Sequence, residues 1–213
     1  MKPVFILSLA MATPLLWQND DYSRYTSEAF FERADVQQKI DPDRLDEELL
    51  NAAVFYASNE ARLEKRKTPL AFDQYLKIAA SLHSDVMEKE GFIGHENSQN
   101  RELRTPMMRI EKAGGNFNAT AENIARVNVF VLGPRMEYFT DKQGRKTDRQ
   151  GNPLVTHSYA SLARMIVNGW MDSKGHRKNL LGEYDHLGCG VSVITYSRQG
   201  IPEILITQNF GKK

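Results

Sequence analysis

Apolar residues recur at helical spacing over several long stretches of the chain. After Asp41-Pro42, a pair suited to the N-cap and first position of a helix, apolar positions follow at intervals of three, four and seven residues. We therefore predict a helix that begins at Asp41, with acidic residues in its first turns and basic residues at its end, as the helix dipole favours. The apolar positions are Leu45, Leu49, Ala52, Ala53, Tyr56 and Leu63.

Three further helices are indicated by apolar stripes and by the residues at their ends. Helix-capping residues, prolines and glycines bracket each stripe. The stripe of the first places His83 on a buried face, and that of the last includes Trp170, so both side chains are predicted to belong to the core. These helices are predicted from Asp73 to Gly91, from Thr105-Pro106 to Gly114-Gly115, and onwards from Thr156 or Ser158.

The C-terminal part of the chain changes to the pattern of β-strands. Residues 188–196 and 203–210 are rich in β-branched and apolar residues, and the turn-forming segment 197–200 lies between them. Val127–Val131 has the composition of another strand, and turn signatures over 141–153 indicate an exposed loop or hairpin. Because helices precede the clearest strands, the order favours an α+β fold over alternating β-α-β units.

The 213 residues are predicted to form one domain with extensions. Residues 13–40 mix polar and aromatic positions without a sustained period, and we interpret them as an irregular lead-in that lies against the domain. The domain itself is assigned to residues 41–213, with an inserted loop or hairpin around 126–155.

Composition excludes several classes of function. The chain has 28 basic and 27 acidic residues, a formal net charge of +1, so it has no strong field that would draw it to nucleic acid. The single cysteine, Cys189, excludes an intrachain disulfide and zinc sites built from cysteine pairs. No apolar run approaches the roughly 20 residues that span a bilayer, so we predict no transmembrane segment.

The first 12 residues have the pattern of a short secretory signal. Lys2 precedes an apolar stretch that ends in the small-residue motif Ala10-Met11-Ala12. The alternative is an apolar strand that belongs to the fold, since Ser8 interrupts the stretch. We expect cleavage near Ala12 and a secreted or periplasmic location.

Three short segments combine histidine or carboxylate side chains with turn-forming residues. They are residues 94–97, 121–124 and 173–177, and we predict each at the boundary of an element, where a scaffold presents polar groups to solvent. Two imidazoles and one carboxylate can bind a divalent metal or share a proton. From spacing alone, solvated histidines are the simpler interpretation.

An ordered set of residues resembles the pattern of bacterial CAP domains, the superfamily of cysteine-rich secretory proteins, venom antigens and plant pathogenesis-related proteins. The resemblance extends over about residues 45–211, and its specificity lies in the order of many short matches. The matches include Asn59, Arg62, Ala80, His83-Ser84, Met87, Gly94-His95, Pro106, Arg109, Ala113-Gly114, Ala121-Glu122-Asn123-Ile124-Ala125, Trp170-Met171, Ser173, Gly175-His176-Arg177-Lys178-Asn179-Leu180-Leu181, Leu187-Gly188 and Thr207-Gln208-Asn209-Phe210.

The resemblance implies a three-layer α-β-α sandwich with a central antiparallel sheet, and a cleft where two histidines meet acidic residues. Matched by position, His95 and His176 are the two histidines and Glu122 is the first acidic residue. Ser173 departs from the pattern, because many eukaryotic members have a glutamate there, and the eukaryotic disulfides are also absent. The predicted site contains these four residues and Asn123, and His95 and His176 are the predicted ligands of zinc or another divalent cation.

Two functions fit these residues. The first is a binding module whose cleft holds a small-molecule, lipid or peptide ligand, since members of the family are linked to lipid or sterol binding and to signalling. The second is a metal-dependent hydrolase in which Glu122 acts as base toward metal-bound water. The chain has no His-Glu-x-x-His motif, and Ser173 has no evident oxyanion hole to act as a nucleophile, so the sequence favours binding.

Overall fold

Four strands form the central sheet of the computed structural model, which describes residues 24–133, 136–194 and 200–213. The strands lie in the order β1-β5-β6-β2, and all neighbours are antiparallel except the short parallel pair β1 and β5. The predicted pairing of the two C-terminal strands is confirmed, while residues 197–199 of the predicted turn between them lie outside the described residues. The strands are β1 (Ala71–Phe72), β2 (Ala119–Asn128), β5 (His186–Ile194) and β6 (Glu203–Lys212).

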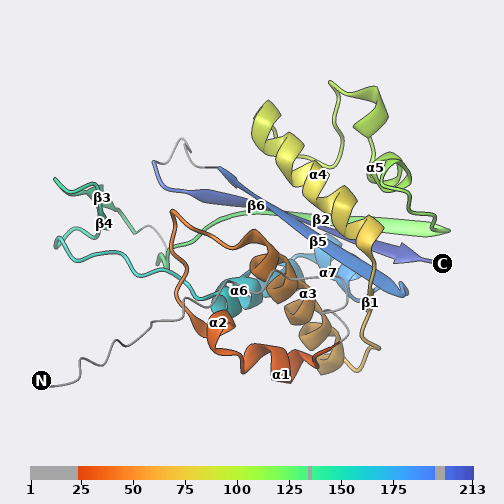
Figure 1. The fold of residues 1–213 in the computed structure, drawn as a ribbon, viewed down its shortest axis with the longest axis horizontal. Helices are drawn as coiled ribbons and strands as arrows, with labels where there is room; N and C mark the ends of the chain where they lie inside the picture. Colours follow the sequence, from red (N-terminus) through yellow and green to blue (C-terminus); the bar gives the residue numbers. More distant parts are fainter. Residues whose placement is uncertain (1–23, 134–135, 195–199) are drawn as a thin grey trace, which may run out of the picture.

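Helices cover both faces of this sheet, as Figure 1 shows. Helices α4 and α5 lie on one face, and α3, α6 and α7 lie on the other. The arrangement is the three-layer α-β-α sandwich that the resemblance to CAP domains implies. The helices are α3 (Glu47–Glu64), α4 (Gln74–Glu90), α5 (Pro106–Lys112), α6 (Tyr159–Asp172) and α7 (Lys174–Leu180).

Side chains alternate between the two faces along β5. Leu187, Cys189 and Val191 are buried in the larger core with α3 and α6. On the opposite face, Gly188 and Gly190 leave room for α4: a Cβ atom added at Gly190 would lie 2.0 Å from the backbone nitrogen of Ser81. Because α4 rests directly on the strand backbone, the segment that follows α4 is held close to the sheet.

Most predicted helix ends agree with the structure, but the start of α3 does not. Asp73, Thr105 and Ser158 cap α4, α5 and α6 as predicted. The predicted start at Asp41 is wrong. The Asp41 carboxylate accepts a hydrogen bond from the amide of Asp43, and its carbonyl accepts one from the amide of Arg44, so Asp41 belongs to a local turn. Asp46 is the N-cap, and its side chain accepts a hydrogen bond from the amide of Leu49.

The lead-in before α3 is more regular than its sequence suggests. Its described part forms two short helices, α1 (Ser27–Phe31) and α2 (Ala34–Gln37). Phe30 is fully buried and stacks on Tyr56 of α3 with ring centroids 4.2 Å apart. The lead-in is therefore part of the core. Its interpretation as irregular was wrong, because the buried Phe30 anchors a segment that is too short to show a helical period in its sequence. The predicted signal, residues 1–12, lies outside the described residues.

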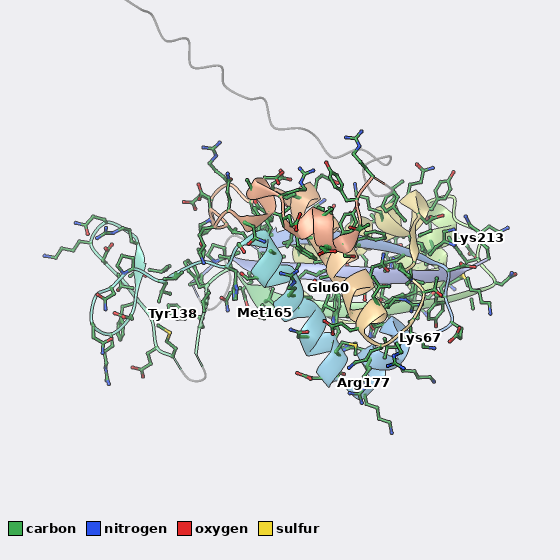
Figure 2. All side chains as sticks on the ribbon, turned by 90° about the horizontal axis from the view of Figure 1, so that it is seen from below. Glu60, Lys67, Tyr138, Met165, Arg177 and Lys213 are labelled. Carbon is green, nitrogen blue, oxygen red and sulfur yellow. The ribbon has the colours of Figure 1, made fainter. Side chains whose placement is uncertain are left out.

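The segment predicted as an exposed loop or hairpin is a hairpin that projects from one end of the sandwich (Figures 1 and 2). Its strands are β3 (Phe139–Thr140) and β4 (Lys146–Thr147). The strand predicted over Val127–Val131 was misplaced, because the strand of this region is β2, which ends at Asn128. Among the described residues, no helix is both long and apolar enough to cross a membrane.

The close approach of α4 to β5 gives a paired prediction. Gly190→Ala should destabilise the fold by about 3 kcal/mol or more, because the added methyl group meets helix backbone that cannot move aside. Gly169→Ala, at an exposed position in α6 with open space around it, should stabilise by up to about 1 kcal/mol. Urea unfolding of both variants tests this, and similar stabilities would contradict the packing argument.

Candidate functional site

The Glu122 carboxylate is the centre of a buried polar cluster. Glu122 lies in the middle of β2, so its predicted place at an element boundary was wrong. Its side chain is only 1% exposed, yet it accepts hydrogen bonds from His95 Nδ1 at 2.9 Å and Arg109 Nη2 at 2.7 Å. With the amide of Asn209 turned to satisfy both of its polar atoms, Asn209 donates to the same oxygen as Arg109 at 3.2 Å. Both carboxylate oxygens are therefore engaged.

Arg109 provides the charge that allows Glu122 to be buried. Its side chain is fully buried beneath α5, and besides Glu122 its guanidinium donates to the backbone carbonyls of Leu103, Arg104 and His95. A buried carboxylate needs such a partner because desolvation strongly disfavours an isolated charge. Arg109 thus fixes both the acid and the loop that carries His95.

His95 is the exposed member of this cluster. It lies in the loop after α4, and its side chain is 53% exposed. The hydrogen bond to Glu122 raises the pKa of His95, with partial burial opposing it. Since Nδ1 is directed to the carboxylate, Nε2 is left for solvent or a ligand, with the ring orientation fixed from behind.

His83 lies beside the cluster but belongs to the core. Its imidazole is fully buried on α4, with Nε2 2.9 Å from the carbonyl of Gly94, an arrangement in which Nε2 carries the proton. Nε2 is also 3.8 Å from Glu122 Oε1, and Nδ1 has no hydrogen-bond partner among the described residues. Burial lowers the pKa of His83. This effect is stronger than the attraction of the Glu122 carboxylate, which raises the pKa.

His176 approaches from the other side of β2, on helix α7. The side chain of Asn123 donates to the carbonyl of His176 at 3.2 Å, and Asn179 donates to Asn123 Oδ1 and to the carbonyl of Glu122. Partial burial lowers the pKa of His176, and the positive charge of nearby His95 lowers it further. His95 thus lies beside β2 through its hydrogen bond to Glu122, and the backbone of His176 lies beside the same strand through Asn123.

Ser173 has a structural position at the joint between α6 and α7. It ends α6 and caps α7, but its hydroxyl makes no capping hydrogen bond. Its carbonyl accepts from the amide of Arg177, whose side chain donates to the carbonyl of Met171 at 2.9 Å. Within the described residues, no hydrogen bond joins Ser173 to Glu122, His95 or His176.

The remaining histidines lie elsewhere. His157 Nδ1 is 3.0 Å from the Ser161 hydroxyl, and His186 Nδ1 is 2.6 Å from Asp185. Within residues 24–133, 136–194 and 200–213, no group of three or more histidine, cysteine, aspartate or glutamate side chains is arranged to hold a metal.

Sequence reasoning missed the part played by Arg109. The sequence signal for Arg109 was its position next to the apolar Ile110 in a short helix. A charged side chain that is buried at such a position needs an oppositely charged partner. Gln208 was missed in the same way: it donates to Ser58 at 2.6 Å and accepts from Asn123, and so ties the site to α3.

Comparison with known proteins shows the family of the chain. A model of the CAP family, described as the cysteine-rich secretory protein family, matches residues 55–210. The chain belongs to the CAP family. Its CAP domain is 27% identical over 157 residues to the uncharacterized membrane protein YlbC of Bacillus subtilis, and 24% identical over 134 residues to the uncharacterized protein YkwD of the same organism. These alignments cover 73% and 62% of this chain but only 32% and 38% of the relatives, so the chain spans about a third of their length.

Two solved structures share the fold of the CAP domain. An extracellular SCP-domain protein from Bacillus anthracis is 25% identical, with a TM-score of 0.52 over 83% of this chain and 45% of that one. An outer surface protein from Borrelia burgdorferi is 20% identical, with a TM-score of 0.50 over 83% of this chain and 98% of that one.

The buried pair of Arg109 and Glu122 gives a stability prediction. Arg109→Met should cost about 3–5 kcal/mol of unfolding free energy, because it leaves a buried carboxylate without its cation. The double variant Arg109→Met/Glu122→Met should lose clearly less than the sum of the two single variants. Denaturant unfolding at pH 7 measures the cycle, and additive losses would show that the two residues do not act as a pair.

His83 gives a prediction for pH dependence. Its pKa lies below 6.5 in the folded state, so the unfolded chain binds the proton first as pH falls. The stability that neutral His83 contributes is present above pH 6.5 and is lost below it, by up to about 1.4 kcal/mol per pH unit. His83→Gln keeps an amide donor for Gly94 and should lose less stability between pH 7.5 and 5.5, which thermal unfolding at each pH would measure. Parallel losses in both proteins would contradict this role.

Proposed function

We propose that this CAP domain is an exported binding module whose recognition site is formed by His95 and His176 at the β2 edge of the sheet. The observation that carries the proposal is the hydrogen bond between the buried Glu122 carboxylate and His95 Nδ1. It orients the imidazole of His95, which is 53% exposed, and leaves the Nε2 atom of His95 for a ligand. Specific recognition needs polar groups held in fixed directions, and this cluster supplies one. The proposed ligand is a small or extended molecule whose groups accept hydrogen bonds from imidazole or are coordinated by it.

A divalent cation such as zinc is the proposed occupant of the two imidazoles. His95 shows the carboxylate-backed arrangement typical of metal-binding histidines, with Glu122 behind the ring. Burial lowers the pKa of His176 and so favours its neutral form, which is the form that binds metal. His95 and His176 would hold the cation, which would supply an open coordination position for an anionic or polar ligand. With two protein ligands, it should bind weakly and exchange.

The hydrolase alternative makes a different demand on Glu122. A general base must reach the proton that it removes, either directly or through one water molecule. Glu122 is buried, and both of its oxygens already accept hydrogen bonds from His95 and Arg109. This favours a positioning role for the carboxylate and binding over catalysis.

Export is part of the proposal. The pattern of residues 1–12 supports it, as does the similarity to an extracellular SCP-domain protein from Bacillus anthracis. The site would then face the periplasm or the exterior of the cell.

Zinc titration followed by calorimetry tests the site. Wild type should bind one equivalent, and His95→Ala and His176→Ala should each weaken binding by about tenfold or more, since each removes one of two protein ligands. His157→Ala, which removes a histidine bonded to Ser161 away from the site, is the matched control and should bind as wild type does.

Two outcomes would overturn parts of this proposal. Equal zinc affinity in all four proteins would remove the metal from the site. Turnover of peptide, ester or glycan substrates at roughly 1–1,000 per second, abolished in Glu122→Gln, would replace the binding module with the hydrolase.

A further inference from the structure

A second surface of the molecule has no part in the His95 site. A groove of about 470 Å³ lies between α1, the outer face of α3 and the side chain of Arg164 from α6. Figure 2 labels Glu60 where α3 and α6 lie side by side, and Figure 1 shows α1 across the end of this layer. Helix α1 precedes the part of the chain that the family model matches.

The floor of the groove is apolar. Leu63 of α3 is 53% exposed, and Phe31 of α1 forms the adjoining wall, with its ring covered by the Arg164 guanidinium at 4.0 Å. A single exposed leucine is common on protein surfaces, but here it lies in a hollow where an apolar side chain can contact it on more than one side. The wall is held in place, since Ser27 donates to the carbonyl of Tyr56 and so anchors α1 on α3.

The rim of the groove is acidic. Four glutamates line it, Glu28, Glu32, Glu60 and Glu64, against the single cation Arg164. Arg164 is committed to Glu60 by two hydrogen bonds of 2.7 Å. Among the described residues, Glu28, Glu32 and Glu64 form no ion pair, so three carboxylates around an apolar floor keep their charge open to a partner.

We propose that this groove binds a cationic amphipathic peptide segment, in which one apolar side chain is flanked by lysine or arginine. Charge complementarity selects this occupant: the apolar side chain would contact the exposed Leu63, and the flanking cations would pair with Glu28, Glu32 and Glu64. The same carboxylates repel phosphate and carboxylate groups, which excludes anionic lipid surfaces and nucleic acids. The surface works independently of the His95 site.

Fluorescence anisotropy with defined probes tests the proposal on the whole chain. The probe is a labelled peptide of sequence Lys-Leu-Lys-Lys-Leu-Lys-Lys-Leu-Lys; one comparison peptide replaces each leucine with serine, and another replaces each lysine with glutamate. The lysine-leucine probe should bind with an affinity that falls as salt rises, and both comparison peptides should bind at least several-fold more weakly.

The variants separate a local site from overall charge. Glu28→Gln/Glu32→Gln/Glu64→Gln removes three charges with little change of shape and should weaken binding roughly tenfold, because it removes all three open rim charges. Glu88→Gln/Glu111→Gln/Glu137→Gln makes the same change in net charge away from the groove and should change affinity less than about twofold. Leu63→Ser, at an exposed position, should weaken the lysine-leucine probe but not the lysine-serine peptide.

Three results would overturn the proposal. Equal weakening by the two triple variants would mean diffuse attraction to net charge. Equal affinity for the leucine and serine probes would mean that the apolar floor has no role. Sedimentation that shows self-association of the wild type, lost in the groove variant, would assign the groove to a second copy of this chain instead.

Discussion

The site of this CAP domain depends on the neutralisation of one buried carboxylate. Glu122 lies on a strand that packs beneath helical layers, where an unpaired charge would be strongly unfavourable. Arg109 resolves this, and in doing so it binds three backbone carbonyls that shape the segment between α4 and α5. The need to compensate a charge and the need to present His95 are met by the same side chain, so stability and the geometry of the site are coupled.

The close packing of α4 on β5 supports that arrangement from a distance. Without side chains at Gly188 and Gly190, α4 lies against the sheet backbone, and His83 on α4 reaches Gly94 of the loop that carries His95. A larger residue at either glycine would lift the helix and with it the exposed imidazole. The glycines therefore help to position the loop that carries His95.

Much of the fold was readable in the sequence, because long amphipathic helices and β-rich C-terminal strands have strong local signals. The end of α4 at Gly91 and the caps at Thr105 and Ser158 were of this kind. The strand β2 was not, since alanine and asparagine make up half of it and its stability comes from its pairing with β6. The site was assigned through family resemblance, and the role of Arg109 could not be predicted, because partners of a buried charge are set by tertiary packing.

The position of β2 at the border of the sheet has a consequence for how ligands can be held. An edge strand usually offers unpaired backbone groups to which another extended chain can add. Here the Asn179 amide occupies the carbonyl of Glu122, and Asn123 and α7 lie against the same stretch. The Glu122 carbonyl is therefore not free to pair with an added strand, so a ligand at the proposed His95 and His176 site would be selected by side-chain chemistry and shape. Extended peptides without groups that suit imidazole should gain little here from their backbone alone.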